Sequence, residues 1–199
     1  MDKSKLTILL DNGHSAGLDT NHSPDKKLIE GKWAREITKE VQNILTSKGF
    51  KVERIVPEDR DIPLSTRSTR VNNICDKVGK ENVLLVSVHI DACDSKVDSE
   101  GWTSANHWSV WVYRACSEAS KKFATAMHTS AKKHGLKVTS EPYRTAGFWI
   151  VRKTKCPAIL TENLFQNNRE NCKWLLSEEG KKTIVDVHVQ GIEDYIKSV

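Results

Sequence analysis

The sequence predicts an α/β fold, a single domain over residues 1–199 in which helices pack on a sheet of about six strands. Short apolar runs of strand length alternate with longer amphipathic segments through most of the chain. A hydrophobic content of 38% and a charged content of 29% fit a globular protein, and no repeat divides the chain. Three of the apolar runs also lead into residues that bind metals or transfer protons, as expected at the strand ends of such a sheet.

The elements of the first half of the chain follow from apolar periodicity and from the positions of glycine and proline. Apolar residues at helical spacing predict a helix from about Glu30 to Ser47, with Gly49 just beyond its end. Pro63 is typical of a helix start and Gly79 of a helix end, which predicts a second helix between them. The other expected elements are strands at 6–10, 51–56 and 83–89 and a polar loop over 15–27.

The second half of the chain continues the alternation. Trp108–Tyr113 has the residue types and alternation of a strand, and it follows an irregular polar loop over 91–106. A helix is predicted over 117–134, and Gly135 closes it. The remaining expected elements are short strands at 148–151 and 158–161 and a helical segment at 168–196 that breaks near Gly180.

Charge, cysteine content and hydropathy exclude several classes of protein. A net charge of +5 favours anionic partners, but the lysines are scattered and no nucleic-acid-binding motif is present. The five cysteines form no Cys-x-x-Cys pair, which argues against a zinc–thiolate site or a disulfide scaffold. No apolar stretch reaches membrane-spanning length, and the first residues lack the features of a signal peptide. We expect no nucleic-acid partner, no membrane segment, and a chain that is either cytoplasmic until released or already processed.

Residues with metal-binding or proton-transfer chemistry follow three of the predicted strands. His14 follows the run at 6–10, His89 follows the run at 83–88, and Glu162 follows the run at 158–160. The ligand crevice of an open α/β sheet lies beyond the carboxyl ends of its strands. We therefore expect these three side chains to meet, although any one strand-end histidine is often structural.

Glu30 adds a fourth residue to this set. It lies at helical spacing from Trp33 and Ile37, so its carboxylate faces inward in the first turn of the predicted helix. A buried carboxylate is costly unless it is paired or bound to a metal. His14, Glu30 and His89 together form a His₂Glu set, the ligand type of catalytic zinc hydrolases. Glu162 would then take a proton from the zinc-activated water and return it to the leaving amine.

Four stretches carry a resemblance to a known family. They are Leu9–His14, Glu30 at the start of its helix, Ser87–Ala92, and Cys156–Phe165 followed by Asn167 and Asn168. With these motifs the chain resembles the zinc-dependent N-acetylmuramoyl-L-alanine amidases of bacterial autolysins and phage endolysins. The resemblance spans nearly the whole chain. Two positions depart from the family pattern: Asn12, where a small residue is usual, and Leu164, where glycine is common.

The resemblance implies both a fold and a reaction. The implied fold is a twisted mixed β-sheet flanked by helices. We expect residues 1–199 to be a catalytic domain without a separate cell-wall-binding domain. The implied site holds one Zn²⁺ per chain on His14, Glu30 and His89, with Glu162 as the catalytic residue. The implied reaction, in the bacterial cell wall, is hydrolysis of the amide between N-acetylmuramic acid and L-alanine in peptidoglycan. We expect a monomer.

Several alternatives stay open from the sequence alone. A zinc amino- or carboxypeptidase, or a wall-binding module that has lost catalysis, would use a related scaffold. Asp91 is expected either to support His89 or to cap a turn. Arg67, on an inward helix face, either binds a substrate carboxylate or forms a structural ion pair, which we favour. Trp102 is a candidate for lining the substrate groove. The other histidines, expected to be structural or solvated, are His22, His107, His128, His134 and His188.

Overall fold

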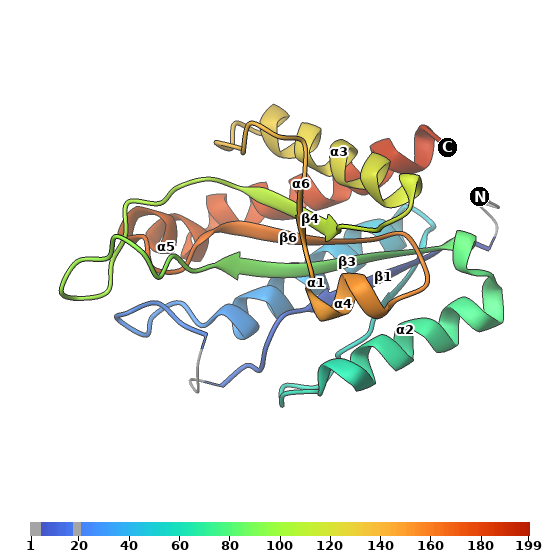
Figure 1. Cartoon of the computed structure of the whole chain (residues 1–199), viewed down its shortest axis with the longest axis horizontal. Helices are drawn as coiled ribbons and strands as arrows, with labels where there is room; N and C mark the ends of the chain where they lie inside the picture. The colour runs from blue at the N-terminus through green and yellow to red at the C-terminus, as the bar shows by residue number, and fades with distance from the viewer. Residues whose placement is uncertain (1–4, 18–20) are drawn as a thin grey trace.

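Six strands form one mixed sheet in the computed structural model, which describes residues 5–17 and 21–199 (Figure 1). The strand order is β2-β1-β3-β6-β4-β5, and all neighbours run parallel except β6 and β4. The strands are β1 (Thr7–Asn12), β2 (Lys51–Arg54), β3 (Val83–Asp91), β4 (Ser109–Tyr113), β5 (Arg144–Ala146) and β6 (Ala158–Phe165). The predicted α/β class and six-stranded sheet are confirmed. Residues 18–20 of the loop expected over 15–27 lie outside the described residues.

Helices cover both faces of this sheet (Figure 1). One face carries α1 (Glu30–Ser47), α3 (Glu118–Lys133) and α6 (Glu178–Lys197). The opposite face carries α2 (Leu64–Val78) and α4 (Trp149–Lys153). The remaining helices are the 3-10 turn η1 (Lys80–Asn82) and α5 (Arg169–Leu176). Within the described residues, no helix combines the length and the apolar composition that crossing a membrane requires.

The central strands are buried on both faces because their side chains alternate between two hydrophobic cores. In β1, Ile8 and Leu10 join the core beneath α1, α3 and α6, whereas Leu9 joins the core beneath α2 and α4. All three side chains are fully buried. A strand with two buried faces has no polar side, which explains why the sequence shows a continuous apolar run there.

The expected strand at 148–151 is wrong. Those residues begin the helix α4, in which Ile150 and Val151 face the core. The sixth strand of the sheet is β5, which was not predicted from the sequence. β5 has only three residues, lies at the edge of the sheet and is largely exposed. Because its side chains are largely exposed, such a strand leaves no apolar alternation in the sequence.

The C-terminal helical segment breaks as predicted, at Ser177, three residues before Gly180. Ser177 Oγ accepts a hydrogen bond from Gly180 N at 3.0 Å and so caps the start of α6. Gly180 lies inside the first turn of α6, where a Cβ would come within 2.0 Å of the Trp174 carbonyl oxygen. The glycine therefore permits close packing of α5 against α6 and does not end a helix.

Leu164 has a φ of 66°, a left-handed conformation that favours glycine and that accounts for the glycine common at this position in the family pattern. We expect Leu164→Gly to be more stable than Leu164→Ala by about 0.5–1 kcal/mol, because only alanine retains the Cβ strain. Both variants lose the burial of a leucine side chain that is 6% exposed. Urea unfolding measures the difference. Leu160, in the same strand, is the control: there we expect the glycine variant to be less stable than the alanine variant. If glycine were also the less stable substitution at Leu164, the inference of backbone strain at Leu164 would be wrong.

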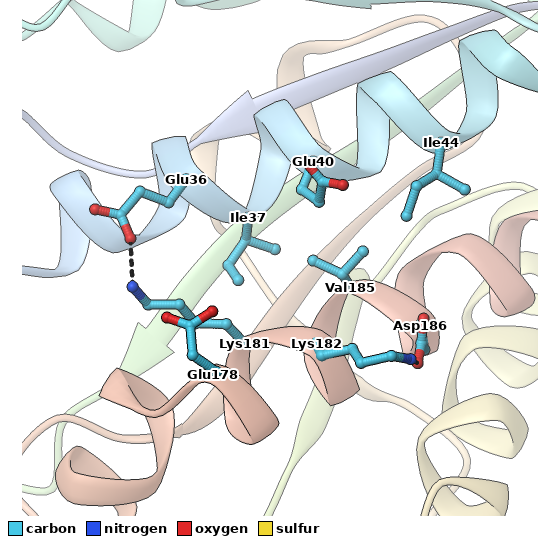
Figure 2. Close-up of a pocket in the computed structure, with 9 residues that line it drawn as sticks. All are labelled: Glu36, Ile37, Glu40, Ile44, Glu178, Lys181, Lys182, Val185 and Asp186. Atoms are coloured by element: carbon cyan, nitrogen blue, oxygen red, sulfur yellow. Dashed lines mark hydrogen bonds and ion pairs between the residues drawn. The ribbon is translucent and has the colours of Figure 1, made fainter.

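A groove lies between α1 and α6, away from the strand ends (Figure 2). Ile37, Ile44 and Val185 line it together with charged residues of both signs. Lys181 Nζ lies 2.8 Å from Glu36 Oε2 across it. None of the predicted site residues lines this groove.

The carboxyl ends of β1, β3 and β6 lie at the same edge of the sheet, at the left in Figure 1. The registers pair Asn12 with Val88 and His89 with Glu162. The loop after β1, the loop after β3 and helix α5 all gather at this edge. The fold therefore brings the three predicted strand-end residues to one place.

Candidate metal centre

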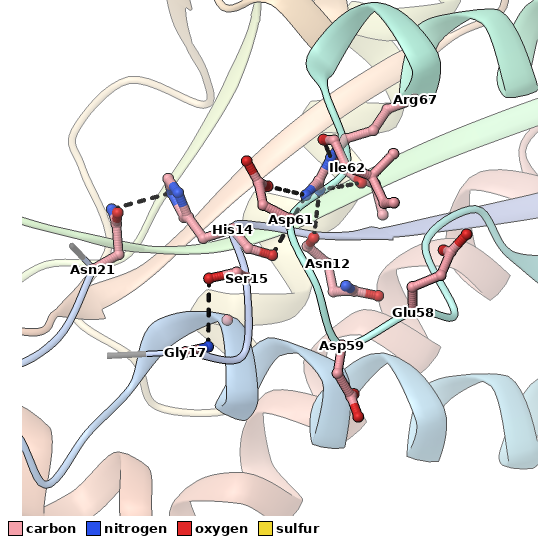
Figure 3. A network of polar contacts seen from close by, with 12 residues as sticks. Asn12, His14, Ser15, Gly17, Asn21, Glu58, Asp59, Asp61, Ile62 and Arg67 are labelled. Carbon is pink, nitrogen blue, oxygen red and sulfur yellow. Dashed lines mark hydrogen bonds and ion pairs between the residues drawn. The ribbon is translucent and has the colours of Figure 1, made fainter. Parts of the chain in front are cut away.

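His14 lies in a strained loop directly after β1. Its φ of 56° is in the left-handed region, which costs a residue other than glycine roughly 1–2 kcal/mol. Arg35 Nη1 donates to the His14 carbonyl at 3.0 Å. Arg67 Nη2 donates to the same oxygen at 3.4 Å (Figure 3). Two guanidinium groups thus hold the backbone that carries this imidazole.

Two glycines let this loop approach its neighbours closely. A Cβ on Gly13 would lie 2.4 Å from the His89 ring. A Cβ on Gly31, in the first turn of α1, would lie 1.8 Å from the Ser15 carbonyl oxygen. Only glycine fits at either position, and both are needed for the loop after β1, the end of β3 and the start of α1 to meet.

Glu30 is the first residue of α1, and its side chain is 1% exposed. Its Oε1 accepts a hydrogen bond from Ile90 N at 3.0 Å. The same oxygen lies 3.0 Å from His89 Nδ1 and 3.5 Å from His14 Nε2. Burial alone would raise the pKa of Glu30, but the two histidines and the Ile90 hydrogen bond outweigh it and lower the pKa. The carboxylate is therefore charged and faces two imidazoles.

The other nitrogen of His89 is held from the opposite side. His89 Nε2 lies 3.1 Å from Ser87 Oγ, and Ser87 Oγ donates to Asp11 Oδ2 at 2.6 Å. The Ser87 hydroxyl has one proton and donates it to Asp11, so its oxygen can only accept a hydrogen bond from His89 Nε2. The other ring nitrogen, Nδ1, therefore faces Glu30. Burial lowers the pKa of His89, but the hydrogen bond and charge of Glu30 raise it to about 9.

The three side chains have the chemistry and spacing of a metal site. His14, Glu30 and His89 each offer one ligand atom, and these atoms lie within 4.8 Å of one another. Ligand atoms of a tetrahedral zinc site lie roughly 3.3 Å apart, given bonds of about 2.0–2.1 Å. The observed separations of 3.0 and 3.5 Å from Glu30 Oε1 bracket that value. Glu30 Oε2 is buried without a hydrogen-bond partner among the described residues, so a ligand atom is left for a cation.

Glu162 lies beside this cluster on the neighbouring strand. Its Cα pairs with that of His89, so the two side chains point to the same face of the sheet. Glu162 Oε2 is buried and has no hydrogen-bond partner among the described residues. Burial raises the pKa of Glu162 to about 8, and the charges of Asp91 and Glu30 add to the rise while His89 opposes it. An unpaired carboxyl group with a raised pKa next to a cation site suits proton transfer.

The structure decides two of the alternatives left open by the sequence. Arg67 is 2% exposed, and its Nη1 lies 2.9 Å from Asp11 Oδ1. It also donates to the carbonyls of Asn12 and Ile62, which confirms the structural ion pair (Figure 3). Asp91 Oδ1 accepts from Ala92 N at 2.8 Å, and among the described residues no hydrogen bond joins its side chain to His89, which favours a local role in the turn.

The other histidines do not join the cluster. His22 Nδ1 lies 2.8 Å from Ser23 O, and the His107 ring packs against Phe165. His188 is fully buried in α6. His128 and His134 hydrogen bond to the backbone carbonyls of Thr139 and Ser130.

Trp102 packs into the protein rather than standing open in the loop after β3. Its side chain belongs to the core beneath α1, α3 and α6 and is only 7% exposed. The Arg169 guanidinium lies 4.5 Å from the centre of its ring. The expectation that Trp102 lines a substrate groove stays a prediction.

Comparison with known families now adds to this geometry. The profile of the N-acetylmuramoyl-L-alanine amidases matches residues 8–194. The chain belongs to this family. The match confirms the family and the class of enzyme that the sequence predicted. The matched residues include all four residues of the candidate site.

Relatives of the chain are found among phages and bacteria. The chain is similar to the endolysin of Bacillus phage SPP1, with 27% identity over 200 residues that cover 97% of this chain and 66% of the relative. It is also similar to the probable cell wall amidase LytH of Staphylococcus epidermidis, with 23% identity over 194 residues, 96% of this chain and 59% of the relative. The chain thus spans about three-fifths to two-thirds of the length of these curated relatives.

Solved amidase structures share the fold. The N-acetylmuramoyl-L-alanine amidase from Clostridium difficile 630 superposes with a TM-score of 0.83 at 23% identity, covering 97% of both chains. The catalytic domain of CwlV from Bacillus (Paenibacillus) polymyxa var. colistinus superposes with a TM-score of 0.80 at 23% identity, covering 96% of this chain and 98% of the other. The whole described sheet and its helices therefore form the amidase fold.

Two residues that support the candidate site were missed from the sequence. Ser87 and Asp11 orient His89, and they pair in the register of β1 and β3. The signal for Ser87 is its position two residues before His89, which places both side chains on one face of the strand. Asp11 has no such signal, because its contact depends on the register between two strands far apart in sequence.

Proposed function

We propose that this chain hydrolyses the amide bond between N-acetylmuramic acid and L-alanine in peptidoglycan. The observation that carries the proposal is the meeting of His14, Glu30 and His89 beside the unpaired carboxyl group of Glu162, within an amidase-family fold. We propose residues 1–199 as the catalytic domain and one Zn²⁺ on the three ligands. The relatives named as an endolysin and as a cell wall amidase support the bacterial wall as the place of action.

The residues of the chain divide the chemistry between binding and proton transfer. Zinc, when bound to such a set, polarises the scissile carbonyl and makes hydroxide available near neutral pH. Glu162 Oε2 accepts the proton of the attacking water and delivers it to the nitrogen of the departing L-alanine. The Glu162 carboxyl group, whose pKa burial raises to about 8, would ionise more readily beside a bound cation and would then be available as the base.

Purified peptidoglycan tests the proposal directly. We expect new L-alanine amino termini and no new reducing sugar ends when the zinc-loaded protein is added. We also expect about one zinc ion per chain, since one three-ligand cluster is present among the described residues. Two zinc ions and release of free amino acids would indicate a peptidase, and tight wall binding without new termini would indicate an inactive module. Either result overturns the proposal.

A Ser87→Ala variant tests the support of the metal ligands. Removing the hydroxyl leaves the His89 Nε2 proton without its acceptor, and we expect zinc affinity to fall about 10- to 100-fold. Competition with a chelator measures the affinity. The matched control is Ser130→Ala, which removes a buried hydroxyl bonded to Val187 O in the helical layer. Equal zinc affinity in the two variants would contradict an orienting role for Ser87.

A further inference from the structure

The pairing of β3 with β6 becomes irregular directly after the two site residues. The strands pair in register up to His89 and Glu162, and the next pair is Asp91 with Phe165. β6 advances by three residues where β3 advances by two, so β6 carries an extra residue in a bulge. The left-handed Leu164 lies within it. Bulges of this kind re-aim neighbouring side chains, so whatever holds this bulge also sets where His89 and Glu162 point.

Asn163 supplies a hydrogen bond across the bulge. Its Nδ2 donates to the backbone carbonyl of His89 at 2.8 Å, and its side chain is fully buried. Successive residues of a strand point to opposite faces, so Asn163 lies on the face opposite Glu162, together with Thr161. The side chain of Asn163, the residue after the proposed proton carrier Glu162, thus donates to the backbone carbonyl of the proposed metal ligand His89.

The orientation of this amide is fixed by its other partner. Trp108 Nε1, which is a donor only, donates to Asn163 Oδ1 at 2.8 Å. The oxygen must therefore face Trp108, and the nitrogen must face the His89 carbonyl. The second proton of Nδ2 reaches Thr161 Oγ1 at 3.3 Å.

The network ends in α6 and is complete. His188 Nδ1 lies 2.7 Å from Ile184 O and must donate to it, so His188 Nε2 accepts from Thr161 Oγ1 at 2.9 Å. Burial lowers the pKa of His188 to about 4, which keeps the ring neutral as this pattern requires. Fully satisfied buried networks specify one arrangement of the elements they join, and this one joins β3 and β6 to α6.

We propose that Asn163 is a positioning residue that fixes His89 relative to Glu162 through its hydrogen bond to the His89 carbonyl. This inference rests on the proposed function, because it assigns Asn163 to the same metal and proton-transfer site. Without the Asn163 side chain the His89 carbonyl loses this buried side-chain donor, and the end of β3 is held less firmly against β6 at the bulge. A misplacement of about 1 Å is enough to slow a reaction on the order of 100-fold.

Asn163→Ala tests the inference. We expect zinc affinity, measured by chelator competition, to fall about 10- to 100-fold, as for other residues that orient a metal ligand. We expect the visible spectrum of the Co²⁺-substituted protein to change, because the geometry of its ligands changes. At saturating zinc we expect kcat on peptidoglycan fragments to fall about tenfold or more, with KM nearly unchanged, because the loss is in positioning and not in substrate binding.

Asn72→Ala is the matched control. Asn72 also bridges two backbone groups, donating to Lys153 O and accepting from Lys155 N at 2.9 Å each, but it does so on the α2 face. We expect it to leave zinc affinity, cobalt spectrum and kcat unchanged. If Asn163→Ala does not fold, Trp108→Phe takes its place, since it removes the donor that orients the amide and should change the same three quantities less.

The outcomes separate the two proposals. A folded Asn163→Ala protein with unchanged zinc affinity and cobalt spectrum overturns the positioning role, and unchanged values in Trp108→Phe do so if Asn163→Ala is unfolded. An unmodified protein that binds zinc but releases no L-alanine termini overturns the proposed function instead. In that case the affinity and the spectrum still decide whether Asn163 positions His89.

Discussion

A Glu162→Gln variant is expected to keep its zinc and to hydrolyse peptidoglycan about 10²–10⁴-fold more slowly than the unmodified protein. Glutamine has nearly the shape of glutamate but cannot accept the proton of the attacking water. Glu162 Oε2 has no hydrogen-bond partner among the described residues, and burial raises the pKa of the carboxyl group to about 8. A neutral amide in its place should therefore cost little folding free energy.

Three measurements on this variant separate catalysis from structure. Zinc content should stay at the level of the unmodified protein, the urea midpoint should not fall, and the rate of L-alanine amino-terminus release should fall. Glu40→Gln, an exposed change on α1, should leave all three unchanged. Full activity in Glu162→Gln would show that another group carries the proton, whereas loss of zinc would make Glu162 part of the metal site.

The strand ends could be predicted from the sequence because each apolar run is buried on both faces. β1, β3 and β6 appear as mostly apolar stretches, and the parallel pairing of β1 with β3 and of β3 with β6 places His14, His89 and Glu162 at one edge. Glu30 could be predicted because helical spacing relates it to buried residues of α1. Local patterns therefore identified all four residues that the structure brings together.

The parts that depend on register could not be predicted. The contact of Ser87 with Asp11 needs β1 and β3 aligned to the residue, and the contact of Asn163 with His89 needs the bulge in β6. β5 was missed because a short exposed edge strand has no apolar pattern, and α4 was taken for a strand because Ile150 and Val151 are adjacent apolar residues. In each case the deciding interaction joins segments distant in sequence.

A Glu30→Gln variant is expected to lose zinc, with affinity falling on the order of 1,000-fold, because removing a ligand costs more than removing its support. Glutamine keeps an oxygen that can accept from Ile90 N, but it removes the negative charge facing both imidazoles. Zinc added to the unmodified protein should raise its melting temperature, since a ligand that binds only the folded state stabilises it. The same addition of zinc should raise the melting temperature of the Glu30→Gln variant much less. Glu58→Gln, which removes a carboxylate paired with Arg70, serves as the control.

If Glu30 binds the metal and Glu162 transfers the proton, the activities of their glutamine variants should respond differently to excess zinc. Excess zinc should restore part of the hydrolysis by Glu30→Gln, because the proton carrier is intact and only affinity is reduced. Excess zinc should restore none of the hydrolysis by Glu162→Gln, because its zinc is already bound. If Glu30→Gln retains tight zinc binding, the metal does not use this carboxylate. The buried, unpartnered Glu30 Oε2 would then need another explanation, since its 1% exposed side chain gains nothing from solvent.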